Sequence, residues 1–214
     1  MCEEKIKPNL IALVMSLCLL FITFFSGHTF AYDLKRTFED LSSIGVAYST
    51  HLFLHELGHQ IVAEDIGAKH HSIQFFTSKD GKFYPGLSTY QDIPKDSKLP
   101  YATGGERMAG VTFEYALSAY RKEPTTFNKA LLIFSNFDFL IYTLMGNYIE
   151  PHNDMYDPNL IRSEVGCSKE TLLGLVALKS LINTYRIFHE DTKIIPVVDV
   201  DKHAAYFMLR FNWD

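Results

Sequence analysis

One short motif in this chain has the residue types and spacing of a metal site: His55-Glu56-Leu57-Gly58-His59. On an α-helix, histidines four residues apart lie about 40° apart around the axis and about 6 Å apart along it, so both can reach one ion. Neutral imidazole suits Zn²⁺, and three protein ligands leave the fourth position for water. Glu56 can accept a proton from that water as general base. The motif therefore predicts a catalytic zinc site.

The motif lies in an apolar stretch, where a cluster of polar side chains is costly without a partner such as a metal ion. Its apolar neighbours are Leu52, Phe53, Leu54, Ile61 and Val62. His51 lies one helical turn before His55, which is too far along the axis for all three histidines to bind one ion. We therefore expect His51 to support the ligands or to pack beside them.

The third ligand is left open by the residues alone. A third histidine six positions after His59 is excluded, because that position is Asp65. Glu106 and Glu114 on a following helix are candidates. Aspartates further along the chain are the alternative: Asp138, Asp154 and Asp157.

Asp138 lies among aromatic and aliphatic residues, where an unpaired carboxylate is expensive. We expect it to have a partner. Asn136 and Asp138 are therefore candidates for the groups that orient the zinc ligands through hydrogen bonds.

The periodicity of the body predicts a mainly α protein, a helical bundle with a small β-hairpin insertion. Residues 72–84 alternate around the turn residues Asp80-Gly81, which is typical of a hairpin. Asp157-Pro158 resembles an N-cap followed by proline at the first helical position. The expected helices are Leu41–Ala63, Tyr101–Tyr120, Lys129–Ile149 and Leu172–Phe188, and Tyr206–Trp213 is expected as a packed strand.

The N-terminus carries sixteen uncharged, mostly apolar residues, Leu10 to Phe25, preceded by Lys5 and Lys7. Small residues follow at Thr29 and Ala31, as before the cleavage site of an export signal. An uncleaved membrane anchor is the alternative, since the run approaches the roughly 20 residues that span a bilayer. The predicted organisation is a signal peptide or anchor at residues 1–31 and one metallopeptidase-like domain at residues 32–214.

Composition excludes three features: a nucleic-acid-binding surface, a zinc cluster built on thiolates, and a disulfide framework. The net charge of −5 offers no basic surface for nucleic acid. Cys167 is the only cysteine after residue 31, so a zinc cluster built on thiolates and a disulfide framework are both excluded from the body.

The order of features resembles the site-2 protease family of membrane-associated zinc metallopeptidases, particularly its smaller bacterial relatives. The resemblance rests on His55-Glu56-Leu57-Gly58-His59, and extends over residues 44–165: a short strand pair ending near Pro85, a Gly-Gly helix, and an apolar helix leading to an Asp-bearing loop. It implies a distant aspartate as third ligand, which falls at Asp154 or Asp157. Asp154 is preferred, because the N-cap role already explains Asp157.

These features predict a zinc-dependent endopeptidase, located in the membrane or exported to the cell envelope, with a peptide or membrane protein as substrate. Two alternatives stay open. One is a soluble exported zinc peptidase with a glutamate as third ligand, and the other is a non-catalytic metal-binding or scaffold protein.

Overall fold

The computed structural model describes residues 34–79, 81–190 and 192–211, so the expected signal or anchor at residues 1–31 lies outside the described residues. Within these ranges the fold is mainly helical, with two antiparallel hairpins, and the predicted fold class is confirmed. The helices are α2 (Leu34–Asp65), α3 (Lys98–Lys122), α4 (Thr126–Leu144), α5 (Asp157–Val165) and α6 (Lys169–Phe188). A 3₁₀ turn, η1 (Lys95–Ser97), precedes α3, and a π-helical turn, η2 (Met145–Ile149), continues α4.

The chain divides into two compact units, Met1–Glu39 and Asp40–Asp214. Helix α2 begins in the first unit and continues into the second. All packing and site geometry described below belongs to the second unit.

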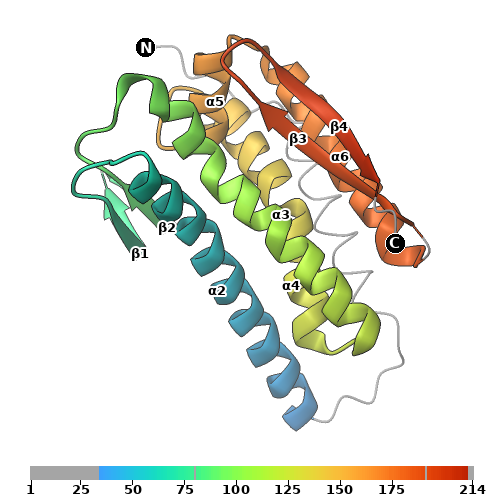
Figure 1. Cartoon of the computed structure of the whole chain (residues 1–214). Helices are drawn as coiled ribbons and strands as arrows, with labels where there is room; N and C mark the ends of the chain where they lie inside the picture. Colours follow the sequence, from blue (N-terminus) through green and yellow to red (C-terminus); the bar gives the residue numbers. More distant parts are fainter. Residues whose placement is uncertain (1–33, 80, 191, 212–214) are drawn as a thin grey trace. The chain divides into compact units, whose positions relative to one another are not determined.

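Two apolar clusters hold the helices of the second unit together. In the first, Ala47 of α2 packs with Phe113 of α3 and Leu131 of α4. In the second, Phe139 of α4 packs with α5 and α6 through Ile161 and its neighbours. Figure 1 shows α2 and α3 as long neighbouring helices, with α4 and α5 behind α3. Burying these faces drives the assembly, at about 25 cal/mol per Å² of apolar surface.

Helices α2 and α3 cross with their backbones in contact, and two glycines allow it. A Cβ placed on Gly104 would lie 2.7 Å from the carbonyl oxygen of Gly58, and a Cβ on Gly58 would collide with the backbone of Gly104. The pair Gly104-Gly105 therefore does not interrupt α3, because the helix continues through it. Its role is to let α2, which carries the metal-site motif, approach closely.

Two ion pairs connect α3 to α6. Lys179 donates to Glu106, whose side chain is buried. Arg186 donates to both carboxylate oxygens of Glu114, at 2.6 and 2.8 Å. Glu106 and Arg186 are the buried members of these pairs, so removing Lys179 or Glu114 would leave a buried charge without its partner, which is strongly destabilising. These two glutamates therefore serve the helix packing.

The first hairpin joins β1 (Ser72–Lys79) to β2 (Lys82–Thr89), as the turn residues predicted. Gly81 has φ +75°, the left-handed conformation that a tight turn requires. The hairpin packs on α2, with the rings of Phe53 and Phe75 6.2 Å apart.

The second hairpin was predicted only in part. The expected tail strand is β4 (Ala205–Phe211), and it pairs with β3 (Ile194–Val200), which the sequence analysis did not predict. Pro196 within β3 weakens the strand pattern, since proline cannot donate to a neighbouring strand. Figure 1 shows this hairpin against α6.

Among the described helices, the stretch Thr126–Ile149 is the one long and apolar enough to cross a membrane. It is 61% buried within the protein, which is typical of a core helix.

Candidate metal centre

Three potential ligand atoms converge at one point between α2 and α5. The Nε2 atoms of His55 and His59 are 3.3 Å apart. The Oδ2 atom of Asp157 is 3.1 Å from His59 Nε2 and 3.7 Å from His55 Nε2. All three side chains are at most 14% exposed. Together they form a group that could hold a metal ion.

The other nitrogen of each ring determines which tautomer is present. His59 Nδ1 lies 2.8 Å from the main-chain oxygen of Tyr101, which can only accept, so Nδ1 carries the proton. His55 Nδ1 lies 2.7 Å from Asp138 Oδ2 and donates to that carboxylate. In the neutral rings both Nε2 atoms therefore present lone pairs to each other and to Asp157. Only a cation between them, a metal ion or a proton, satisfies this arrangement.

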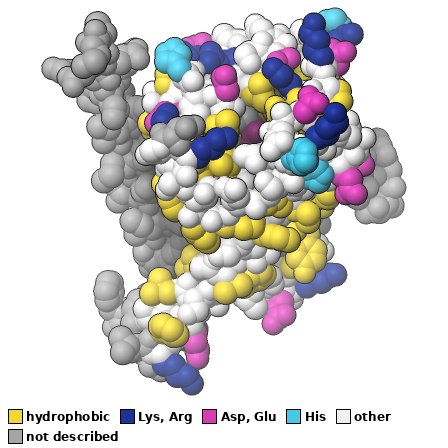
Figure 2. Space-filling view, turned by 90° about the vertical axis from the view of Figure 1, so that its left-hand side faces the viewer, with side chains coloured by type: hydrophobic (Ala, Val, Ile, Leu, Met, Phe, Trp, Pro, Cys, Tyr) yellow, Lys and Arg dark blue, Asp and Glu magenta, His cyan; other side chains and the backbone are white. Residues whose placement is uncertain are grey.

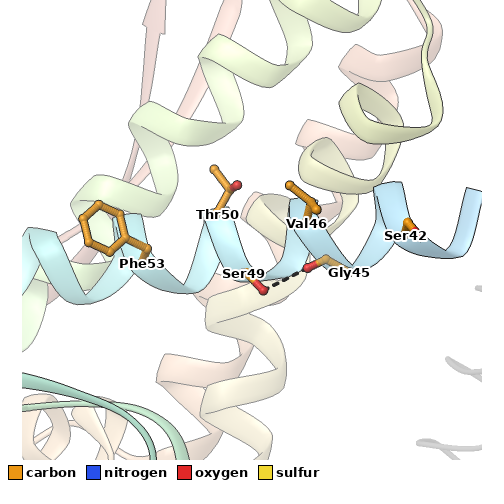
Figure 3. Close-up of a pocket in the computed structure, with 6 residues that line it drawn as sticks. All are labelled: Ser42, Gly45, Val46, Ser49, Thr50 and Phe53. Carbon is orange, nitrogen blue, oxygen red and sulfur yellow. Dashed lines mark hydrogen bonds between the residues drawn. The ribbon is translucent and has the colours of Figure 1, made fainter. Parts of the chain in front are cut away.

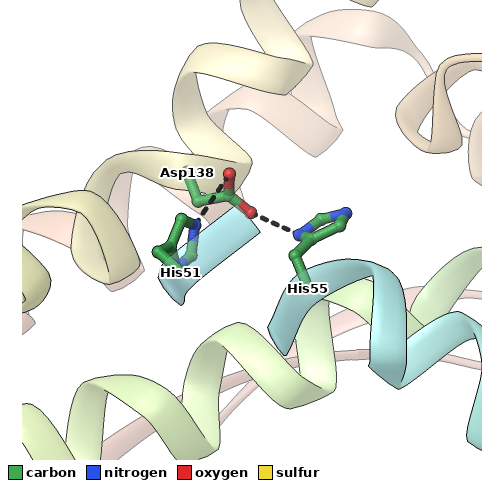
Figure 4. Close-up of side chains that lie close together, drawn as sticks. All are labelled: His51, His55 and Asp138. Atoms are coloured by element: carbon green, nitrogen blue, oxygen red, sulfur yellow. Dashed lines mark hydrogen bonds and ion pairs between the residues drawn. The ribbon is translucent and has the colours of Figure 1, made fainter. Parts of the chain in front are cut away.

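Asp138 has partners, as expected of a carboxylate in an apolar segment: it bridges His51 and His55 of α2 (Figure 4). Its Oδ1 lies 3.1 Å from His51 Nε2, an ion-pair distance at which the N–H is not aligned for a hydrogen bond. His51, His55 and Asp138 form a second group that could hold a metal ion. The 2.7 Å between His55 and Asp138 is, however, a hydrogen-bond length, and we interpret His51 and Asp138 as support for His55.

The structure places Asp157 at the two histidines and Asp154 away from them. The predicted N-cap role of Asp157 is wrong: Tyr156 occupies the N-cap of α5 and makes no side-chain cap. Asp157 is the first residue of α5, and Pro158 is the second, one position later than predicted. The carboxylate of Asp157 instead faces the two histidines. Asp154, the preferred third ligand in the sequence analysis, is exposed and belongs to neither group of potential ligands.

The other expected site residues lie elsewhere. Asn136 donates to the Thr184 hydroxyl at 3.0 Å and so binds α4 to α6, away from the histidines. Glu106 and Glu114 are held in their ion pairs. The contribution of Tyr101 was not predicted, because a main-chain carbonyl leaves no signal in side-chain spacing.

Glu56 lines a small cavity beside the three converging atoms. The cavity measures about 20 Å³, room for about one water molecule. Its lining consists of Glu56, His59, Gly86, Leu87, Ser88, Tyr101, Tyr142, Met155 and Asp157.

Two glycines leave space at this centre. A Cβ on Gly86 of β2 would lie 2.6 Å from Oε1 of Glu56. A Cβ on Gly105 of α3 would lie 2.5 Å from His59 Nε2, and closer still to His55 Nε2. The backbone of β2 at Gly86 and of α3 at Gly105 therefore lies directly against the centre. A larger residue at Gly86 would displace Glu56, and one at Gly105 would displace the histidines.

The charges of the metal-free centre are strongly coupled. Burial opposes charge on both histidines, but the carboxylates of Asp138 and Asp157 outweigh it and raise the pKa of His55 and of His59. Burial raises the pKa of Glu56, and the two histidines offset part of that rise. The same histidines overcome the burial of Asp157 and lower its pKa. A metal ion at this centre would take the place of the protons on His55 and His59.

Burial also raises the pKa of the Tyr101 phenol, and the nearby Ser88 hydroxyl offsets part of that effect. Tyr101 therefore stays a neutral hydrogen-bond donor at ordinary pH. Its ring packs against His59, with the centroids 5.2 Å apart.

The pH dependence of stability should have opposite signs without and with metal. Because the pKa values of His55 and His59 lie above 6.5 in the metal-free fold, their protonation stabilises it fully below pH 6.5. This contribution is lost as pH rises through the raised pKa values, whereas metal affinity increases over the same interval. Melting temperatures between about pH 6 and 9 should therefore diverge, falling with chelator and rising with metal. A metal-free protein that grows more stable over this range would contradict the expectation.

Substitution distinguishes Asp157, the first residue of α5, from Asp154 in the loop before it. We expect Asp157→Asn to weaken metal affinity by more than about 100-fold, because the loss of a mere supporting partner already costs about 10–100-fold. Asp138→Asn should fall within that smaller range. Asp154→Asn is the matched control and should bind metal like the wild type. Competition titration with a chromophoric chelator measures all three, and equal losses in Asp154→Asn and Asp157→Asn would contradict the placement.

A second concave feature lies along α2. It is an open hollow lined by Ser42, Gly45, Val46, Ser49, Thr50 and Phe53 (Figure 3). Ser49 donates to the main-chain oxygen of Gly45 at 3.0 Å. None of the lining residues is a titratable or metal-ligating group, so the hollow adds no chemistry to the centre.

Comparisons of the chain with models of protein families, with curated proteins and with solved structures found no match. The centre is therefore interpreted from its own residues.

Proposed function

We propose that the protein is a zinc-dependent endopeptidase, with zinc held by His55, His59 and Asp157 and with Glu56 as general base. The convergence of three ligand atoms carries the proposal. Tetrahedral zinc with ligand bonds of 2.0–2.1 Å separates its ligand atoms by about 3.3–3.4 Å. The three separations here are 3.1, 3.3 and 3.7 Å, which bracket that spacing.

Bound zinc would polarise a scissile carbonyl and lower the pKa of a coordinated water toward about 7. Glu56, whose side chain lines the cavity, accepts the proton of the attacking water and passes it to the leaving amine. Asp138 and the Tyr101 carbonyl keep the two histidines in the tautomer that ligation needs.

The resemblance to the site-2 protease family remains part of this proposal. It is supported by an aspartate, Asp157, that meets the two histidines from a later helix. A soluble peptidase with a glutamate third ligand is not proposed, because Glu106 and Glu114 are engaged in ion pairs.

We further propose that the protein associates with a membrane and cleaves a peptide or a membrane protein there. The uncharged run Leu10 to Phe25 would provide the attachment. Exposed hydrophobic side chains on α2 and the first hairpin add support, namely Leu41, Val46, Phe53, Ile61, Phe75, Phe76 and Phe83. Figure 2 shows one face on which hydrophobic side chains gather in a zone with few charged groups. Cofractionation with membranes after a carbonate wash tests this part.

The first experiment is metal content by mass spectrometry on purified wild type and His59→Ala, together with hydrolysis of a peptide library. We expect about one zinc per chain in the wild type, its loss in the variant, and hydrolysis that chelation abolishes and zinc restores. No metal in either protein would overturn the site. Stoichiometric zinc without any hydrolysis would favour the non-catalytic alternative.

A further inference from the structure

The hydroxyl of Tyr101 is the buried polar group at the centre that the mechanism above does not use. Tyr101 is only 5% exposed, and its hydroxyl has no hydrogen-bond partner among the described residues. The nearby Ser88 hydroxyl accepts a hydrogen bond from Gln60 at 2.5 Å. Buried polar groups are nearly always paired, so an unpaired one requires an explanation.

Tyr101 is held rigidly beside the candidate zinc ligands. Its main-chain oxygen accepts from His59 Nδ1 at 2.8 Å, and its ring leans on the imidazole of His59. On the other side, the ring of Tyr90 packs against it edge to face, with the centroids 4.7 Å apart. These contacts leave the ring little freedom to turn away from the site.

The same side chain forms part of the wall of the cavity that contains Glu56 and Asp157. The lining of this cavity therefore combines a phenol with the proposed general base. Tyr142 also lines the cavity, but it lies beside His55, its ring 5.9 Å from that imidazole. It also lacks a main-chain bond to either histidine ring among the described contacts.

We propose that Tyr101 is a catalytic residue whose hydroxyl donates a hydrogen bond to the substrate carbonyl oxygen as that oxygen becomes an oxyanion. The inference rests on the proposed peptidase function, and it adds a residue that stabilises the oxyanion to the zinc ligands and the general base. Preorganised donors of this kind lower the barrier because negative charge develops on that oxygen in the transition state.

The step balances without a further reactant. Water oxygen forms a bond to the carbonyl carbon while Glu56 takes a water proton, and the carbonyl π electrons move onto oxygen. Tyr101 keeps its own proton and donates only a hydrogen bond to the oxyanion. When the C–N bond breaks, its electron pair leaves with nitrogen, which takes the proton from Glu56, and the pair on the oxyanion re-forms the carbonyl.

The test compares zinc-loaded wild type with Tyr101→Phe, using Tyr90→Phe as the matched control outside the cavity. Its readout independent of activity is the calorimetric Kd of a phosphoramidate dipeptide, whose tetrahedral anion imitates the oxyanion. We expect Tyr101→Phe to retain zinc and fold but to bind this probe about 10–100-fold more weakly, and to lose about 10²-fold in kcat with little change in KM. Tyr90→Phe should match the wild type in both measurements.

Several results would overturn the inference. Equal probe affinity in wild type and Tyr101→Phe would do so, as would a wild type that holds zinc but does not bind the probe. A loss found in Tyr142→Phe and absent from Tyr101→Phe would assign the role to the other tyrosine. Probe binding that depends on Tyr101 in a protein that hydrolyses no peptide would support the anion site while rejecting the peptidase function.

Discussion

Replacing Gly105 by alanine should abolish metal binding while leaving the helical fold intact. The added Cβ would lie 2.5 Å from His59 Nε2 and closer still to His55 Nε2, distances that non-bonded carbon and nitrogen do not adopt. The histidine rings must therefore rotate away, and the two ligand atoms no longer converge. We expect zinc content to fall from about one per chain to near zero, with helical content by circular dichroism unchanged.

Gly110→Ala is the matched control for this prediction. Gly110 lies on the same helix, and a Cβ added there would meet nothing within 4 Å. This variant should keep its zinc and gain up to about 1 kcal/mol in stability, since alanine is the better helix former. A Gly105→Ala protein that binds zinc with wild-type affinity would show that the ligand atoms meet elsewhere.

Substitution of Glu56 by glutamine should separate catalysis from metal binding. Glutamine retains the size of the side chain but cannot accept a proton from water. Since Glu56 is not among the converging ligand atoms, the variant should contain as much zinc as the wild type. Positioned general bases contribute about 10²–10⁴-fold, so we expect kcat for peptide hydrolysis to fall by that factor.

The control is Glu64→Gln, at an exposed position two turns further along α2. It removes the same charge from the same helix without approaching the centre, and its hydrolysis should equal that of the wild type. If Glu56→Gln hydrolyses peptides at the wild-type rate, Glu56 is not the base. If Glu56→Gln loses its zinc, Glu56 contributes to metal binding itself and the separation of the two roles is wrong.

Local features of the chain were predictable because they depend on neighbours a few residues apart. The spacing His55-x-x-x-His59 puts two imidazoles on one face of any helix, and an apolar stretch without proline supplied that helix. Likewise, Asp80-Gly81 between alternating residues predicted the first hairpin, which the structure contains. The mainly helical class followed from the same periodicities.

Contacts between distant parts of the chain were decided only by tertiary structure. Asp154 and Asp157 are three residues apart in one polar segment, and only the path of the chain into α5 turns Asp157 toward the histidines. The N-cap pattern at Asp157-Pro158 pointed to a local role, but the carboxylate pairs with His59 instead. The sequence was compatible with Asp157 as an N-cap and with Asp157 as a metal ligand, and the placement of α5 beside α2 favours the second role.

The same limit applies to the groups that orient the histidines. Sequence predicted that Asp138 needs a partner, but its hydrogen bond to His55 spans 83 residues, and the carbonyl of Tyr101 reaches His59 across 42. The contact with Tyr101 depends on how closely α2 and α3 cross, which Gly58 and Gly104 permit, whereas the contact with Asp138 depends on how α4 packs beside α2. The helical periodicity of one segment determines which side chains share a face; what that face meets depends on the packing of all the helices together.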